Sequence, residues 1–299
     1  MTSKKQLFAF LDGSKEKIEM AIDESTIHVC GIKYLRSVIK DSEPLDFIFD
    51  ITSSAADDVI SFLLDRSHLR KVKFLTPRVE TLYLWRNPSE YELMPVLRPN
   101  GYYTHLSAMY FHGFVNYQPQ SLYFNHEQQA RPVTGNLEQS RIDNAFKKKQ
   151  RITTSKTKHD KKEYWLLNGK QTGNYGVVPI KTADNIQIAV TDLERTLIDI
   201  TVRPAYDGGV KSVLEAYKSA QPKISIPKLS ATLRALSYLY PYHQSVGFYI
   251  ETAGNYSPEA IEEFANYKTF DYDFYLDYEM KNPAYSNRWR MYYPQDLVT

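Results

Sequence analysis

The sequence has little of what several common classes of protein require. Its 299 residues include a single cysteine, Cys30, which excludes an internal disulfide and any cysteine-based zinc site. No apolar run approaches the ~18 residues of a membrane-spanning helix. Residues 1–20 alternate charged and apolar side chains and do not resemble a secretory signal. We therefore expect a cytoplasmic protein with no membrane partner.

Motifs of catalysis are also missing. The seven histidines are scattered along the chain, and neither a Ser-His-Asp order nor a phosphate-cradling glycine loop occurs. His105 and His112 are seven positions apart on one predicted helix, so they lie on one face about two turns apart and are too distant to bind one metal ion. The sequence therefore predicts no enzyme, no cofactor and no metal site.

The charges that are present are unevenly distributed. Apolar residues make up 42% of the chain and charged residues 24%, which is ordinary for a globular protein of one large or two smaller domains. The net charge is only +2, yet residues 101–200 hold 13 Lys and Arg against 9 Asp and Glu. Within them, residues 141–170 hold ten cations against three acids. The positive excess is therefore a local cluster in the middle third.

Residues 1–90 follow the element order of a DNA-binding domain. A helix with a break at Asp12-Gly13-Ser14 is predicted first, and two β-strands are predicted around Thr76-Pro77-Arg78. This order is typical of a winged helix-turn-helix, so we interpret residues 1–90 as a winged-helix-like DNA-binding domain. The alternative is a small helical domain with an incidental hairpin. The helices are predicted at 4–22, 31–40 and 55–67, an apolar run occupies 45–51, and the strands are predicted at 70–75 and 79–85.

Five cations cluster at the end of the third helix and on the hairpin. Side chains of this kind pair with the phosphates that flank a major groove. Acidic residues on the same helix oppose this interpretation, because Asp57, Asp58 and Asp65 would face the phosphates. The alternative is a solvated surface hairpin. The five candidate DNA-binding residues are Arg66, Arg70, Lys71, Lys73 and Arg78.

The remainder of the chain predicts a second, larger domain. Pro88, Pro95 and Pro99 stand among polar residues, so residues 86–100 are a candidate linker. Strands and helices then mix without strict alternation, which favours α+β over a doubly wound sheet. Strands are predicted at 121–126, 163–168, 174–180, 186–190, 276–279 and 289–293, and helices at 103–112, 192–201, 208–219, 227–240 and 258–266.

The helix at 192–201 has the clearest apolar stripe in the chain. Leu193, Leu197 and Ile198 are expected to be buried, with Thr191 as the N-cap and Glu194 completing a capping box. Arg195 lies between the buried positions, where an unpaired cation would be costly. We therefore predict an ion pair between Arg195 and Asp199, which follows four positions later, and a structural role for Arg195.

Three segments resemble one bacterial family. The helix just described, with Arg203-Pro204 and Gly208-Gly209 after it, reads TDLERTLID…RP…GG…VLEAY. Residues 103–113 read YTHLSAMYFHG, and residues 287–291 read NRWRM. In this order the segments resemble the C-terminal domain of AbiEi-family antitoxins, and the resemblance covers about residues 98–299. It implies a larger mixed α+β AbiEi-like domain after the winged-helix-like one.

The resemblance also implies a function. AbiEi-like proteins are antitoxins that also act as autoregulatory transcriptional repressors. The chain is therefore expected to bind operator DNA upstream of its own operon and to counteract a cognate nucleotidyltransferase-like toxin, genetically or by contact.

A second basic segment lies in the larger domain. We expect it to cap a hairpin whose second strand begins at Tyr164-Trp165, where it would bind nucleic acid or an acidic partner. The alternative is a solvated loop, which charge runs often form. The candidate residues are Lys147, Lys148, Lys149 and Arg151, with Lys156, Lys158, Lys161 and Lys162 following.

One enzymatic alternative remains near the C-terminus. If residues 271–281 form a strand, Asp277, Glu279 and Lys281 share one face at period two. In a Mg²⁺-dependent nuclease, carboxylates hold the metal ion while a lysine helps to orient water. The same alternation is also that of a half-exposed structural strand, with Phe274 and Leu276 turned inward.

Overall fold

The computed structural model describes residues 4–41, 53–75, 78–130 and 136–298. These residues form a mixed α+β structure with several sheets, as the sequence predicted. The chain divides into two compact units. Unit 1 comprises Met1–Pro99 and Ala183–Ile186, and unit 2 comprises Asn100–Thr182 and Gln187–Thr299. In the part of the chain described, no helix is both long enough and apolar enough to span a bilayer.

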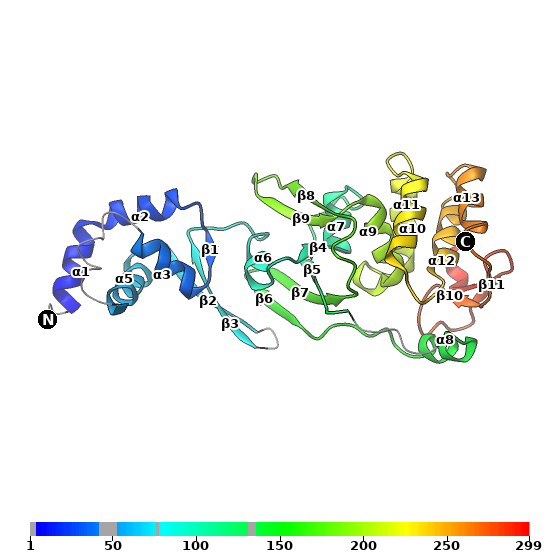
Figure 1. Ribbon diagram of the computed structural model, residues 1–299, viewed down its shortest axis with the longest axis horizontal. Coiled ribbons are helices and arrows are strands. Elements are labelled where there is room, and N and C mark those ends of the chain that lie inside the picture. Colours follow the sequence, from blue (N-terminus) through cyan, green and yellow to red (C-terminus); the bar gives the residue numbers. More distant parts are fainter. Residues whose placement is uncertain (1–3, 42–52, 76–77, 131–135, 299) are drawn as a thin grey trace. The chain divides into compact units, whose positions relative to one another are not determined.

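Unit 1 contains a helical cluster and a three-stranded sheet (Figure 1). The predicted break at Gly13 separates the first two helices, and the apolar run at 45–51 lies outside the described residues. The short strand β1 pairs with β3, and β3 pairs with β2, all antiparallel. The elements are α1 (Lys4–Gly13), α2 (Lys15–Glu24), β1 (Val29–Cys30), α3 (Ile32–Lys40), α5 (Ser53–Arg66), β2 (Leu69–Leu75), β3 (Val79–Trp85) and α6 (Leu93–Leu97).

One apolar cluster joins the helices of unit 1 to its sheet. Leu11 of α1, Ile39 of α3 and Phe62 of α5 are all inaccessible to solvent and pack together with Trp85 of β3. Burial of apolar side chains of this size stabilises by roughly 1.5–3 kcal/mol each relative to exposure. The cluster therefore fixes the hairpin of β2 and β3 to the helices.

Unit 2 is built around a six-stranded mixed sheet with the order β6-β7-β5-β4-β9-β8. Two pairings are parallel, β4 with β9 and β5 with β7, while the hairpins β6–β7 and β8–β9 are antiparallel. The strands are β4 (Tyr102–Tyr103), β5 (Ser121–Glu127), β6 (Lys156–His159), β7 (Lys162–Gly169), β8 (Val177–Lys181) and β9 (Gln187–Thr191).

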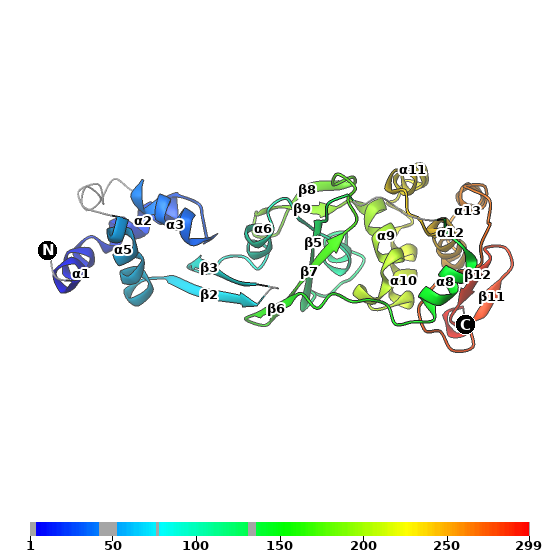
Figure 2. The ribbon, with the colours of Figure 1, turned by 60° about the horizontal axis from the view of Figure 1, so that its bottom comes forward.

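Layers of helices follow the sheet in unit 2. Figures 1 and 2 place α9 and α10 between the sheet and the pair α12 and α13. A second, small sheet with the order β10-β12-β11 packs beside α12. The helices are α7 (Leu106–Phe111), α8 (Gln139–Phe146), α9 (Leu193–Val202), α10 (Val210–Ala220), α11 (Ile226–Leu236), α12 (Tyr242–Ala253) and α13 (Pro258–Ala265), and the strands are β10 (Phe274–Tyr275), β11 (Ala284–Ser286) and β12 (Met291–Tyr293).

Helix α12 has no counterpart among the predicted elements. Its residues from Tyr242 to Ile250 are all buried, so it lacks the polar face that makes a helix visible as a period of 3.6. Gly247 lies against the indole of Trp289, and a Cβ at this position would overlap the ring. Trp289, the first residue of the strand predicted at 289–293, thus packs against α12 at Gly247, the one glycine of this helix.

Four expectations about local structure were wrong. Asp192, not Thr191, caps α9, because its carboxylate accepts a hydrogen bond of 2.8 Å from the amide of Arg195. Leu193 is only partly buried, whereas Leu197 and Ile198 are inaccessible to solvent. The candidate linker 86–100 contains α6, whose Met94 is buried. Finally, residues 276–279 were predicted to form a strand and do not.

Candidate functional site

The hairpin of unit 1 presents its cations on two faces. Lys71 and Lys73 share one face of β2, where they stand opposite Tyr83 and Thr81 of β3, and both are exposed. The ammonium of Lys71 lies 5.8 Å from the centre of the Tyr83 ring. Arg70 is on the other face and donates a hydrogen bond of 3.0 Å to the carbonyl of Arg86. The hairpin therefore holds a short row of exposed positive charge.

Arg66 differs from the other cations proposed for DNA binding. Its guanidinium donates to the carboxylate of Asp12 on α1 and lies 3.4 Å from that of Asp65. It also lies 5.7 Å from the centre of the Phe8 ring. Arg66 thus connects α5 to α1 in this structure.

The acidic residues of α5 are partly balanced. Arg36 of α3 binds Asp57 through two hydrogen bonds of 2.9 Å each. These hydrogen bonds, which Arg36 donates to the Asp57 carboxylate, raise the pKa of Arg36. Two of the three carboxylates that the sequence placed against a DNA backbone, those of Asp57 and Asp65, therefore have their charge offset within unit 1 by Arg36 and Arg66.

The second basic segment is divided between two places in unit 2. Lys147, Lys148 and Lys149 follow the end of α8 and do not cap the hairpin of β6 and β7, which begins later. On that hairpin, Lys158 pairs with Glu163 at 2.9 Å, and Lys156 lies 4.5 Å from the centre of the Trp165 ring. These two lysines therefore have partners within unit 2.

Five cations, two of them the lysines Lys148 and Lys149 after α8, line a hollow that we call the basic hollow. Its volume is about 550 Å³, and Tyr240 and Tyr278 form part of its wall. Neither Arg151 nor Arg203 forms an ion pair with a carboxylate of the described chain, and one nitrogen of Arg203 donates to the carbonyl of Arg151 at 2.9 Å. The hollow is thus positively charged without an internal counterion. Its cations are Arg141, Lys148, Lys149, Arg151 and Arg203.

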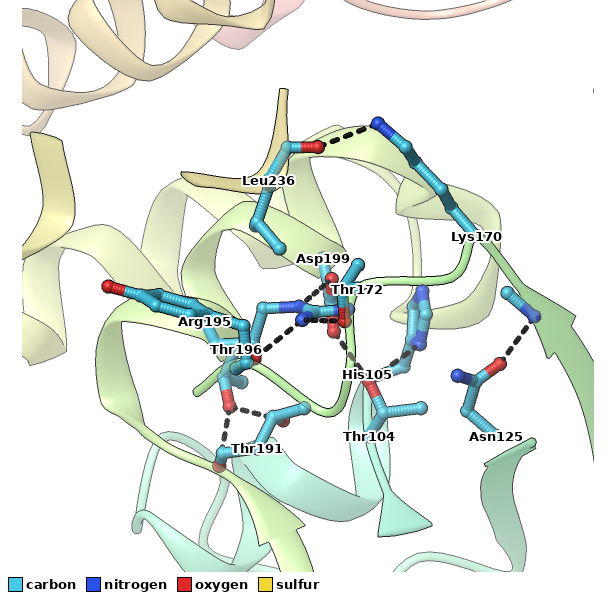
Figure 3. A network of polar contacts seen from close by, with 12 residues as sticks. Thr104, His105, Asn125, Lys170, Thr172, Thr191, Arg195, Thr196, Asp199 and Leu236 are labelled. Carbon is cyan, nitrogen blue, oxygen red and sulfur yellow. Dashed lines mark hydrogen bonds and ion pairs between the residues drawn. The ribbon is translucent and has the colours of Figure 1, made fainter. Parts of the chain in front are cut away.

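A buried ion pair holds the centre of unit 2 together (Figure 3). As predicted, the Nε of Arg195 binds Asp199 at 2.8 Å, and the two side chains are 5% and 8% exposed. The guanidinium also donates to the carbonyl of Tyr175 at 2.7 Å and to the hydroxyl of Thr172 at 3.2 Å. Burial opposes the charge of Arg195, but Asp199 and other neighbours more than offset it, so its pKa is raised.

The second oxygen of Asp199 starts a chain of hydrogen bonds. It accepts a hydrogen bond of 2.9 Å from the hydroxyl of Thr104, whose oxygen lies 3.1 Å from Nδ1 of His105. A hydroxyl has one hydrogen, and the carboxylate takes it, so Thr104 accepts from His105. Burial lowers the pKa of His105 to about 4. The imidazole is therefore neutral, with its proton on Nδ1.

Nε2 of His105 is consequently a hydrogen-bond acceptor, and no described residue is its partner. Figure 3 shows the imidazole with one nitrogen toward Thr104 and the other directed away from it. The backbone of His105 has φ 53° and ψ −135°, a conformation that costs a non-glycine residue roughly 1–3 kcal/mol. Strain and an unpaired buried nitrogen at one residue are typical of binding sites.

His105 lines a cavity of about 390 Å³ in unit 2, which we call the His105 cavity. It is lined by Asn125 of β5, by Lys170, which directly follows β7, and by residues at the end of α9. The ammonium of Lys170 donates to the carbonyls of Leu236 and Ser237. Arg151 and Arg203 line both the His105 cavity and the basic hollow, so these two side chains lie where the cavity and the hollow adjoin.

The strand on which the alternative nuclease site would depend is not formed. Only Phe274–Tyr275 is a strand in this region, and Glu279 has φ 47° with its amide bound to the carbonyl of Phe146 at 2.8 Å. Asp277, Glu279 and Lys281 therefore do not share a strand face. Within the described ranges, no group of three His, Cys, Asp or Glu residues is arranged to hold a metal ion.

The two longer segments of the family resemblance meet in space, which the sequence alone did not reveal. Thr104 binds Asp199, and Nε2 of His112 donates to the carbonyl of Thr191 at 2.6 Å. Sequence reasoning assigned no binding role to Thr104, His105 or Arg203. The signal for the first two was their place within the segment 103–113.

Comparison with known proteins bears on the fold alone. No protein-family model and no curated protein matches this sequence. The structure is similar to the crystal structure of the RV2827C protein from Mycobacterium tuberculosis, with a TM-score of 0.59 and 12% sequence identity. The similarity covers 95% of this chain and 91% of that one, so the two proteins share a fold over nearly their whole length.

Replacing Arg195 tests its structural role. Arg195→Met leaves Asp199 buried without its cation, and breaking a buried pair in this way costs roughly 3–5 kcal/mol. We expect a lower melting temperature by differential scanning calorimetry, and unchanged DNA affinity per folded molecule. Lys181→Met, which removes an exposed cation on β8, is the control. A stable Arg195→Met variant that loses DNA binding would contradict the structural role.

Acid should destabilise unit 2 through its buried histidines. Burial lowers the pKa of His243 from 6.5 to about 4, so the unfolded chain takes up a proton between these values that the folded one does not. Stability is therefore lost as the pH falls through this window, at about 1.4 kcal/mol per pH unit for each such histidine.

Burial raises the pKa of the Asp207 carboxyl, so its contribution to stability falls as the pH rises, opposite to that of His243. The measurement therefore compares the slope of stability against pH in the wild type with the same slope in a variant that lacks His243. Urea unfolding of the wild type and of His243→Phe, followed across the window, should give a slope of stability against pH that is smaller in the variant by about 1.4 kcal/mol per unit. Equal slopes would show that His243 is protonated in the folded protein.

Proposed function

We propose that this protein is a DNA-binding transcriptional repressor that also acts as an antitoxin. The observation that carries the DNA-binding part is the architecture of unit 1. Among the described residues, helices, a short strand, the helices α3 and α5 and a hairpin follow one another, and the short strand pairs with the last strand of the hairpin. This order and pairing resemble those of a winged helix-turn-helix and support the proposal that α5 is the recognition helix and β2–β3 the wing.

The charges of unit 1 favour contact through the wing. Lys71 and Lys73 are exposed on one face of β2, and Arg78 is exposed beyond the turn. Cations of this kind bind phosphates on either side of a groove and position a protein on DNA without reading its sequence. Because Arg36 offsets Asp57, the recognition helix approaches DNA with less negative charge than its sequence suggests.

The antitoxin part rests on the resemblance of unit 2 to AbiEi-family proteins. Its segments are adjacent in the folded chain, through the contacts of Thr104 with Asp199 and of His112 with Thr191. We propose a cytoplasmic protein whose partners are operator DNA and a nucleotidyltransferase-like toxin, and which has no catalytic activity of its own.

The wing is tested with the protein's own promoter fragment. Purified protein should retard the fragment in a gel, and replacing Arg70, Lys71, Lys73 and Arg78 together by alanine should abolish the shift while circular dichroism stays unchanged. Log affinity falls as log salt concentration rises, and each cation removed from a DNA phosphate should make this slope shallower by about 0.9. A second variant replaces the other candidate DNA-binding residues, Lys147, Lys148, Lys149 and Arg151, by alanine. If the wing variant binds undiminished, the wing assignment is wrong, and loss of binding in the second variant would then assign DNA binding to the segment after α8.

The antitoxin role is tested in cells. We expect the neighbouring gene of the same operon to encode a nucleotidyltransferase-like protein whose expression arrests growth, and co-expression of this chain to restore it. The wing variant, supplied from an unrelated promoter, distinguishes neutralisation by contact with the toxin from repression of the toxin gene. It should still restore growth if neutralisation needs contact, and should fail if it needs operator binding. Growth arrest that wild-type chain does not relieve would refute the antitoxin role.

A further inference from the structure

The His105 cavity combines features that the repressor function does not use. His105 lines this cavity, and its Nε2 is a buried acceptor with no partner among the described residues. The chain Asp199–Thr104–His105 fixes the proton on the other nitrogen, so Nε2 is held as an acceptor by its neighbours. An acceptor fixed in this way selects a ligand that brings a hydrogen-bond donor.

The mouth of the cavity carries positively charged hydrogen-bond donors. Arg151 and Arg203 lie where the His105 cavity meets the basic hollow, and neither is neutralised by a carboxylate of the described chain. Guanidinium groups bind phosphate oxygens through paired hydrogen bonds. Asp199 is the one carboxylate in the cavity lining, and both of its oxygens are already hydrogen-bonded. The ligand is therefore an anion.

The walls and the size narrow the class of ligand further. Tyr206 and Tyr238 line the cavity together with apolar side chains such as Leu167 and Val202. Aromatic side chains are the surfaces on which nucleic-acid bases stack. A volume of about 390 Å³ lies near the lower end of small-molecule sites, which span roughly 300–1,000 Å³, and suits a single nucleotide.

We propose that the His105 cavity binds one nucleotide, with its phosphate between Arg151 and Arg203 and a donor of its base or sugar on Nε2 of His105. The nucleotide is either free or the terminal residue of a single strand. In the second case the following phosphates lie in the basic hollow, along Lys148 and Lys149. This site is independent of DNA binding by the wing of unit 1.

Calorimetric titration of the full chain tests the proposal. The probes are AMP, GMP, CMP and UMP, inorganic phosphate, and a single-stranded hexanucleotide with a 5′-phosphate. At least one mononucleotide or the hexanucleotide should bind saturably and more tightly than phosphate. Arg151→Met and Arg203→Met remove exposed side chains, so both variants should fold, and each should weaken binding about 10-fold or more, as the loss of a charge-assisted hydrogen bond does. Lys181→Met should bind as the wild type does.

His105→Phe keeps a ring at the buried position but removes the acceptor. It should weaken nucleotide binding and leave phosphate binding unchanged, because phosphate needs only the two arginines. If this variant is not folded by circular dichroism, the arginine variants still decide the question.

The sources of the ligand are distinguished by the same titrations. Tighter binding of the hexanucleotide than of every mononucleotide, lost on replacing Lys148 and Lys149 by alanine, identifies a strand end. If the hexanucleotide and the best mononucleotide bind equally tightly, the ligand is a free nucleotide. The proposal is overturned if no nucleotide probe binds, if phosphate binds as tightly as the nucleotides do, or if Arg151→Met and Arg203→Met leave affinity unchanged.

Discussion

Unit 2 depends on the ion pair between Arg195 and Asp199. A guanidinium removed from water needs partners for its donors, and each of the three nitrogens of Arg195 donates a hydrogen bond. These bonds join α9 to the hydroxyl of Tyr102 and to the segment that carries Thr172 and Tyr175. Gly176 has φ 73°, and a Cβ there would lie 2.8 Å from Cβ of Arg195. The segment after Tyr175 can therefore close over the arginine only with glycine at this position. Because Asp199 also fixes Thr104, the same pair orients His105.

The two units use positive charge differently. In unit 1, Arg66 and Arg36 bind carboxylates of neighbouring helices and so contribute to the fold, whereas Lys71 and Lys73 on the hairpin are exposed. In unit 2, the hairpin lysine Lys158 is paired, whereas Arg151 and Arg203 have no carboxylate partner among the described residues. A run of cations in the sequence does not distinguish these cases, since pairing depends on residues that are distant along the chain.

The similarity to the RV2827C protein extends over nearly the whole chain at 12% identity. A fold can persist at this identity because burial patterns and volumes are kept while side chains change. Function resides in particular groups placed on a fold and does not follow from the fold itself. The proposals for DNA and nucleotide binding therefore rest on named side chains of this chain, the antitoxin proposal rests on the resemblance of three sequence segments, and each has its own test.

The sequence by itself determined the elements whose pattern is local. The break at Gly13, the helix α9 and the pairing of Arg195 with Asp199 follow from caps, glycine and spacing within one turn or two. Helix α12 was not predictable, because a helix buried on all sides has no period. The apparent strand through Glu279 was wrong because its amide binds Phe146, 133 positions earlier. Only the tertiary structure brought His105 to Asp199 and Arg203 to the cavity, since such contacts depend on how the sheet and helices pack and not on any neighbouring residue.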